Sequence, residues 1–451
     1  MAAQRTIEEN PKFRSLKTQR MFLGLLATIL TYLLLYCVLS ITHEPDLDSH
    51  WGIDFGWQLW TGEKWWKLLL AMLFMLLVTL SSSSALSKGE HVKQLYPEPK
   101  KKAEAESDIE LPAHISAEEI VSVTMELAEE MDVDIKGIYV GIDPTPNAFT
   151  TFALETGNIV FINSNLLDIL DAQSIRAVIA HELGHVKNKD VLHRMGILVP
   201  KQVLRLWLIM LIVQILGVLL LSFGIWDFVQ RSALAVLSLS LYATATGFVE
   251  RFEKQYSRIK EKMADAYAVE YTSFESMVNG FVRLNDRSHT LKTFMKALKK
   301  AGGSVSTEVL QEALNIFPRG SKSSADIQQH AARYYAHAHL NLLLKKLSSD
   351  ISVAQRNDWV HVMLDNQKKE ENEKHKEKGE KKAELEPSVE PPFVWQDFDW
   401  NHDGLLQREE IAAMVEALKK NPTAMTSKEE EDAEHPPVRD RILFLADMFG
   451  E

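Results

Sequence analysis

The stretch Ala177-Val-Ile-Ala-His-Glu-Leu-Gly-His185 is the most informative in this chain, because it sets two histidines four residues apart. A helix is predicted from Ala172 to roughly Leu198. Residues four apart are neighbours on one helix face, so the imidazoles of His181 and His185 can both reach a metal ion about 2.0 to 2.1 Å away. The spacing therefore predicts a zinc site.

Glu182 follows the first histidine and projects toward the open side of the predicted metal. There it can take a proton from the water that the metal activates. Taken alone, the motif also fits a charged turn on a surface helix. Its neighbours argue against that alternative, because Ala177-Val-Ile-Ala180 before it is apolar and Val186-Lys-Asn-Lys-Asp190 follows it. The helix is therefore amphipathic and presents the motif from a buried segment.

A third ligand has to come from elsewhere in the chain, since catalytic zinc keeps three protein ligands and one water. The candidate is Glu261 in Ser257-Arg-Ile-Lys-Glu-Lys-Met-Ala-Asp265, a predicted helix in which Glu261 and Asp265 share a face. Asp265 is then expected to accept an imidazole N–H and so fix the tautomer of that ring.

Four apolar runs are candidates for membrane spans. Met21 to Thr42 is about 22 residues without a charge, enough to cross a hydrocarbon core of roughly 30 Å. Leu68 to Leu86 and Leu206 to Trp226 are similar in character. The fourth run, Ser232 to Val249, is short and rich in Ser, Thr and Ala, so it either spans fully or is re-entrant or interfacial.

The charges that flank these runs predict their orientation. Residues 1–20 are basic and contain no small-residue cleavage site, which favours a signal anchor with a cytosolic tail. The connection between the first two runs is mainly acidic, whereas lysines follow the second run. Residues 21–86 should therefore form an outward hairpin that returns the chain to the cytosol. Basic residues from Arg251 to Lys262 support an even number of crossings.

The remaining segments predict a mainly α fold with a small β-sheet, an α+β arrangement. Ser116-Ala-Glu-Glu119 has the capping-box pattern of a helix start. Apolar, β-branched stretches predict strands from Ile138 to Ile142 and from Asn158 to Ile162. Further helices are expected around Leu166 to Leu170, over Tyr256 to Tyr271 and over Phe274 to Leu298.

Two short segments, Pro146-Asn-Ala-Phe149 and His435-Pro-Pro-Val-Arg-Asp-Arg441, complete a family pattern. Together with the two metal-binding helices and the order of the apolar runs, they make the chain resemble the HtpX-like membrane zinc peptidases, relatives of the CaaX prenyl protease and of the periplasmic chaperone-peptidases. The resemblance covers roughly residues 110 to 290 and the C-terminal end. It implies a gluzincin-type peptidase domain in a multi-pass protein of the bacterial inner (plasma) membrane. The charges that flank the apolar runs predict that its active site is on the cytosolic side.

The resemblance also implies roles for particular residues. One zinc ion would be held by His181, His185 and Glu261, with Glu182 as the base. By the same resemblance, Asn147, Ala148 and Phe149 lie beside the cleft and precede the edge strand on which substrate is laid by β-addition. His435 and Arg441 would approach the zinc and bind the oxyanion of the tetrahedral intermediate. The alternative for that pair is an ordinary His-Pro turn and a surface arginine.

The expected division of the chain follows from these segments. The peptidase core contains the HExxH motif, the apolar runs 206–226 and 232–249 and the third-ligand helix. In order, the predicted parts are the tail 1–20, the hairpin 21–86, a linker 87–109, the peptidase core 110–318, an insertion 319–428 and the His-Pro segment 429–451. The insertion is not expected in a plain HtpX. Its stretch from Lys368 to Lys382 should be disordered or a solvated helix.

The insertion contains Asp399-Trp-Asn-His-Asp-Gly-Leu-Leu-Gln-Arg-Glu-Glu410, which matches the twelve-residue EF-hand calcium loop. Gly404 stands where the loop needs its sharp turn. The predicted calcium ligands are Asp399, Asn401, Asp403, Leu405, Gln407 and Glu410. EF-hands usually pair, and the sequence shows no second loop. The alternative is an acidic turn that binds nothing.

The composition of the chain excludes some structural features and argues against some binding partners. The only cysteine, Cys37, excludes any intrachain disulfide. A net charge of −12 argues against nucleic acid as the main partner, because phosphate binding needs a concentrated basic surface. The expected partners are membrane-protein or other polypeptide substrates and the lipid bilayer, and the oligomeric state stays open.

The combined pattern predicts hydrolysis of peptide bonds in membrane or membrane-associated misfolded proteins, with calcium as a modulator. Two alternatives stay open. A CaaX-type prenyl-protein protease resembles this site but is built with more spans. A non-catalytic, calcium-responsive membrane scaffold would keep zinc only for structure, and Glu182 argues against it, since a structural site has no use for a base beside the metal.

Overall fold

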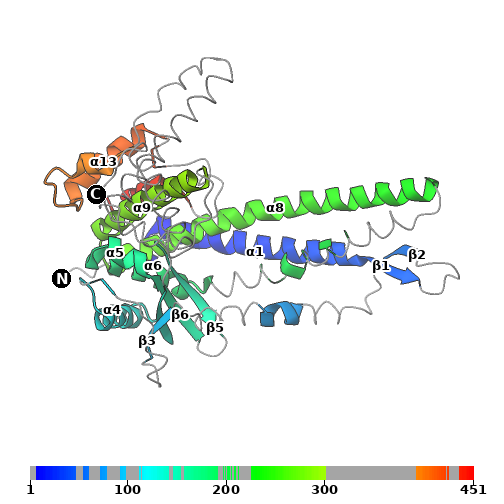
Figure 1. The fold of residues 1–451 in the computed structure, drawn as a ribbon, viewed down its shortest axis with the longest axis horizontal. Coiled ribbons are helices and arrows are strands. Elements are labelled where there is room, and N and C mark those ends of the chain that lie inside the picture. Colours follow the sequence, from blue (N-terminus) through cyan, green and yellow to red (C-terminus); the bar gives the residue numbers. More distant parts are fainter. Residues whose placement is uncertain are drawn as a thin grey trace, which may run out of the picture.

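The computed structural model of the chain describes most of the predicted peptidase core and parts of the other segments. The described residues are 7–46, 54–59, 72–78, 92–97, 111–112, 114–141, 146–153, 157–190, 225–300, 393–422, 424–425 and 436–450, with scattered positions between 197 and 212. Helices predominate and pack against one small mixed sheet, as the sequence predicts (Figure 1).

The mixed sheet supplies one wall of the region around the two histidines. Its strands are β3 (Val92–Tyr96), β4 (Gly137–Gly141), β5 (Ala148–Ala153) and β6 (Gly157–Asn163), in the order β3-β4-β6-β5. β4 and β6 are the two predicted strands and pair in parallel, while β5 pairs antiparallel with β6. Among the described strands, β5 therefore forms one edge of the sheet. β3 lies in the predicted linker and was not anticipated.

Two short helices connect the sheet to the rest of the core. α4 (Ala117–Glu130) begins with the predicted capping box, in which the Ser116 hydroxyl accepts from the Glu119 amide at 3.2 Å and the Glu119 carboxylate accepts from the Ser116 amide at 2.7 Å. α5 (Ser164–Ile169) follows β6 directly. Both helices bury apolar side chains in the main hydrophobic cluster.

Two long helices, α1 (Pro11–Ser40) and α8 (Ile225–Tyr271), run side by side away from the sheet (Figure 1). α8 joins the apolar run 232–249 and the predicted third-ligand helix into one continuous helix. The segment before the first apolar run packs against α8. It contains η1 (Ile7–Glu9), and the Phe13 ring lies 5.1 Å from the ring of Tyr267 in α8.

Beyond α1, a small hairpin pairs β1 (Ile41–Asp46) with β2 (Asp54–Leu59). None of the helices in the described residues combines the length and the apolar character that a membrane crossing requires. The predicted runs 68–86 and 206–226 lie mostly outside the described residues.

α6 (Ala172–Lys187) carries the HExxH motif and packs against α4 and α8. The predicted end of this helix near Leu198 is wrong, because α6 stops at Lys187 and Lys189 takes a positive φ of 56° in the turn that follows. α9 (Phe274–Lys300) confirms the helix predicted after the third-ligand segment. From the C-terminal part come η3 (Trp395–Phe398), α13 (Arg408–Lys420) and α15 (Val438–Phe449). Residues 319–392 of the insertion, including 368–382, lie outside the described residues.

Candidate metal centre

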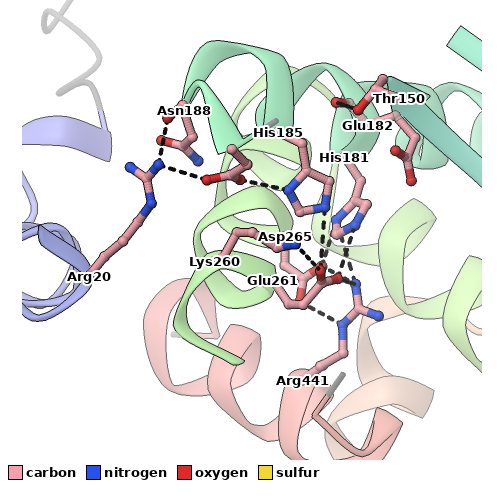
Figure 2. Close-up of polar contacts among 11 residues, drawn as sticks. Arg20, Thr150, His181, Glu182, His185, Asn188, Lys260, Glu261, Asp265 and Arg441 are labelled. Carbon is pink, nitrogen blue, oxygen red and sulfur yellow. Dashed lines mark hydrogen bonds and ion pairs between the residues drawn. The ribbon is translucent and has the colours of Figure 1, made fainter. Parts of the chain in front are cut away.

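Two helices, α6 and α8, pack against each other and supply the predicted ligands. α6 carries His181 and His185, and α8 carries Glu261 (Figure 2). The helices approach closely at Gly184, where an added Cβ would lie 3.1 Å from the Cα of Ala264. The glycine between the two histidines therefore lets the backbone of α8 bring Glu261 within reach of both rings.

The three ligand side chains have the spacing that a tetrahedral metal needs. The Glu261 carboxylate lies 3.5 Å from His181 Nε2 through Oε2 and 3.6 Å from His185 Nε2 through Oε1. Bonds of about 2.0 to 2.1 Å in a tetrahedral site place ligand atoms roughly 3.3 Å apart. All three residues are buried, and in the described parts of the chain no other His, Cys, Asp or Glu trio brings its ligand atoms within 4.8 Å. The donors and their geometry fit zinc.

Carboxylates behind the two rings fix which nitrogen faces the metal site. Asp265 lies 2.8 Å from Nδ1 of His181, where the sequence analysis expected it. Asp190 lies 2.8 Å from Nδ1 of His185. A carboxylate accepts the proton on Nδ1, so each ring presents the Nε2 lone pair toward Glu261, which is the tautomer that binds a metal.

Asp190 is itself held by a residue that is distant in the sequence. Arg20 in α1 donates from Nη2 to Asp190 Oδ1 at 2.7 Å and to the carbonyl of Asn188 at 2.5 Å (Figure 2). Arg20 and Asp190 are both buried. In the sequence, Arg20 is one of several basic residues before an apolar run, and no pattern there gives Asp190 a role. The available signal was weak, since it consisted of one acidic residue just after the motif.

Arg441 of α15 reaches the same centre through Asp265. Its Nε donates to Asp265 Oδ2 at 2.8 Å, and its Nη2 binds the other oxygen of that carboxylate. The same Nη2 lies 3.9 Å from Glu261 Oε2, and the guanidinium lies 4.2 Å from the centre of the Phe281 ring. Arg441 thus approaches the metal centre, as the resemblance implied. His435, its expected companion, lies outside the described residues.

The electrostatics of the centre favour a cation. Burial alone would lower the pKa of His181, but the carboxylates of Asp265 and Glu261 raise it to about 9. Burial alone would raise the pKa of Asp265, but Arg441 and His181 hold it below its ordinary value. Several buried carboxylates that face two imidazoles stabilise positive charge between them.

Glu182 lies at the wall of the cavity rather than in the ligand set. Burial is the largest cause of its raised pKa. A carboxylate whose pKa is raised toward neutrality is better matched to proton transfer. Its backbone carbonyl accepts from the Thr150 hydroxyl of β5 at 3.4 Å, which ties the HExxH helix to the edge strand.

A cavity of about 670 Å³ opens over the metal centre. On one side it is bordered by the start of β5, with Asn147, Ala148 and Phe149, the segment predicted to contact substrate. The resemblance implied that this segment precedes the edge strand. Asn147 does precede β5, whereas Ala148 and Phe149 are already its first residues. Residues of α9 and α15 also line the cavity, among them Phe281, Leu284, Asn285, Val438 and Arg441.

A buried His-His-Glu cluster with a carboxylate beside it, in a cavity that a strand edge also lines, is typical of zinc-dependent peptidases. The model of Peptidase family M48 matches residues 114–448, which is most of the chain. The chain belongs to peptidase family M48, and the resemblance to HtpX-like zinc metallopeptidases is confirmed.

Individual relatives match shorter parts of this chain than the family model does. A protein named Protease HtpX homolog 1 from Saccharolobus solfataricus is 28% identical over 189 residues, 40% of this chain and 56% of that protein. A Protease HtpX homolog from Thermoplasma acidophilum is 29% identical over 147 residues, 32% of this chain and 43% of that protein. One from Dictyoglomus thermophilum is 48% identical over 54 residues, 12% and 18% of the two chains. The chain thus spans roughly half or less of the length of these relatives.

Proposed function

We propose that this chain is a membrane-bound zinc metalloendopeptidase of the HExxH plus Glu type. The observation that carries the proposal is the convergence of His181, His185 and Glu261 at the base of a cavity that Glu182 lines. Two imidazoles and one carboxylate leave a fourth position open, as catalytic zinc sites do.

Zinc, when bound, supplies a Lewis acid that polarises the scissile carbonyl and makes water nucleophilic at neutral pH. Glu182 takes the proton from the attacking water and passes it to the leaving amine. Asp265 and Asp190 hold the two imidazoles in their working tautomer. Arg441 holds Asp265, and its positive charge beside Glu261 favours negative charge that develops in the cavity.

An extended polypeptide is the substrate shape that suits this cavity. β5 lies at an edge of the described sheet, and its first residues line the cavity. An added strand would take main-chain hydrogen bonds from such an edge, while side-chain pockets select residues. Asn147, Ala148 and Phe149 are the proposed contacts. We expect substrates to be membrane or membrane-associated proteins, including misfolded ones.

The membrane location is supported by the apolar runs and by the surface of α1. Met21, Phe22 and Leu25 expose 66%, 64% and 61% of their surface. Exposed apolar side chains clustered along one helix indicate contact with lipid or another apolar partner. We place the chain in a bacterial inner membrane with the active site on the cytosolic side. A reporter fused after Lys102 should be cytosolic and one near Ser49 external, and the reverse result refutes this orientation.

The decisive experiment compares purified wild type with Glu182→Gln. The variant should keep its zinc and lose nearly all cleavage of an unfolded membrane-protein substrate, because the base is removed and the three ligands remain. Glu129→Gln, an exposed residue of α4, is the matched control and should behave as wild type. Near-normal activity in Glu182→Gln would contradict the role of Glu182 as the general base. Cleavage of a farnesylated peptide but not of the unfolded protein would favour the CaaX-type alternative.

Calcium modulation is the remaining part of the proposal. It is supported by the loop from Asp399 to Glu410, which matches the EF-hand pattern.

A further inference from the structure

The loop from Asp399 to Glu410 lies between η3 and α13 and is folded around its own acidic side chains. The amides of Asp403, Gly404 and Leu405 donate to side-chain oxygens of Asn401, Asp399 and Asp403 at 3.0, 2.9 and 2.8 Å. Gly404 has a φ of +79°, which only glycine adopts without strain. These contacts direct side-chain oxygens of the first, third and fifth loop positions toward the backbone amides of the loop, where Asp399 is buried and Asn401 and Asp403 are exposed.

Asp399 is the residue that points to a ligand. It is 6% exposed, and only one of its carboxylate oxygens, Oδ2, is used within the loop, by the Gly404 amide. The other oxygen, Oδ1, is buried and has no hydrogen-bond partner among the described residues. A buried carboxylate oxygen without a partner is costly, and a cation is one of the few groups that can satisfy it.

We propose that this loop binds one calcium ion. Side-chain oxygens would come from Asp399, Asn401 and Asp403, and further oxygens from the carbonyl of Leu405, a water on Gln407 and both oxygens of Glu410. An all-oxygen set with a bidentate carboxylate suits calcium better than zinc or magnesium. The Glu410 carboxylate now accepts from the amides of Trp400 and Gln407 at 2.8 and 2.7 Å, so binding has to turn it toward the ion.

The loop is attached to α9 by polar contacts. Asn279 of α9 accepts from the Leu406 amide at 2.7 Å and donates to the Leu406 carbonyl at 2.9 Å. Arg283 of α9 binds the Gly404 carbonyl and also lies 3.3 Å from Asp171, whose side chain caps the start of the HExxH helix α6. The loop therefore connects through α9 to the helix that carries both histidine ligands.

A second connection runs through α13 to α15. Arg439 donates from Nε to the carbonyls of Leu418 and Asn421 at 3.1 and 3.2 Å, at the end of α13. Arg439 and Arg441 belong to the first turn of the same helix. Turning Glu410 toward an ion acts on the first turn of α13, so calcium should restrain the helix that delivers Arg441. An effect of this restraint on catalysis, through Arg441, rests on the proposed peptidase function, whereas calcium binding itself does not.

The first test measures calcium binding by isothermal titration of the full chain, purified in detergent with zinc held constant. Wild type should bind one calcium ion, and Glu410→Gln and Asp399→Asn should bind it about tenfold or more weakly. Glu416→Gln removes an exposed carboxylate of α13 that pairs with Lys419, and it should match wild type. No saturable binding in wild type, or equal affinity in wild type and Glu410→Gln, overturns the proposal.

The second test follows hydrogen exchange of residues 438–449 with and without calcium. Calcium should slow exchange there in wild type and not in Glu410→Gln. Asn279→Ala should still bind calcium but show a smaller change in exchange across α9, with thermal unfolding used to check that it folds. Calcium binding without any change in exchange in wild type overturns the connection to α15. Neither test measures proteolysis, so their failure is distinguishable from failure of the peptidase proposal.

Discussion

Nη2 of Arg20 lies 2.7 Å from Asp190, a residue 170 positions later in the sequence, and the other carboxylate oxygen of Asp190 holds His185. The first helix of the chain is thereby connected to a metal ligand through a single carboxylate. Burial of both Arg20 and Asp190 makes the pair sensitive to the loss of either partner.

Arg20→Ala should weaken zinc affinity by about tenfold, because an unpartnered Asp190 no longer fixes the His185 ring. The loss of a buried ion-pair partner should also lower the free energy of unfolding by about 3 kcal/mol. Lys17→Ala, which removes an exposed cation of the same helix, is the control. Chelator competition measures the affinity, and an Arg20→Ala variant with wild-type zinc affinity contradicts the role given to the pair.

His185→Ala and Glu261→Ala should each lose both zinc and activity, since each removes a metal ligand. Zinc content after dialysis, measured by atomic absorption, distinguishes this outcome from that of Glu182→Gln. If Glu261→Ala retained zinc as tightly as wild type, the third ligand would have to be another residue.

Gly184→Ala should separate α6 from α8, because the new methyl group meets the backbone of Ala264 at 3.1 Å. We expect a loss of about 1 to 3 kcal/mol in the free energy of unfolding and weaker zinc binding. Gly247→Ala provides the matched control, since an added Cβ there meets nothing within 4 Å. Helix propensity should make that second substitution neutral or slightly stabilising. Equal behaviour of the two variants in thermal unfolding argues against the close approach.

Arg441→Met distinguishes two roles of the guanidinium. If Arg441 acts mainly by holding Asp265, the variant should bind zinc about tenfold more weakly, because the support of His181 is lost. If it acts only on the oxyanion, zinc affinity should stay unchanged while kcat falls. The bidentate contact with Asp265 leads us to expect the first result, measured by chelator competition alongside kcat and KM.

The ligand set could be predicted from the sequence because each pair of residues is positioned by a single turn of helix. His181 and His185 lie one helical turn apart, and Glu261 and Asp265 share another turn, so each pair is fixed by helix geometry alone. Only the meeting of the two helices required the fold. The capping box at Ser116 and the strands β4 and β6 were predictable for the same reason, since short patterns determine them.

What the sequence analysis missed depends on contacts between distant segments. Arg20 resembles any basic residue before an apolar run, and only the packing of α1 against α8 brings it to Asp190. β3 is a short strand in a charged linker, and its pairing with β4 gives the segment its structure. The continuity of α8 was hidden because its apolar and charged halves have different patterns.

Because α8 is one continuous helix, it fixes both the distance and the rotation between its apolar half and its metal-binding half. Val249, at the end of the apolar run, and Glu261 lie on the same unbroken helix, roughly 18 Å apart along its axis at 1.5 Å per residue. A residue inserted between them would lengthen that distance only slightly, but it would rotate Glu261 by about 100° relative to the apolar half. The distance of Glu261 from the apolar segment and the direction in which its carboxylate points are therefore set together, by the number of residues between them.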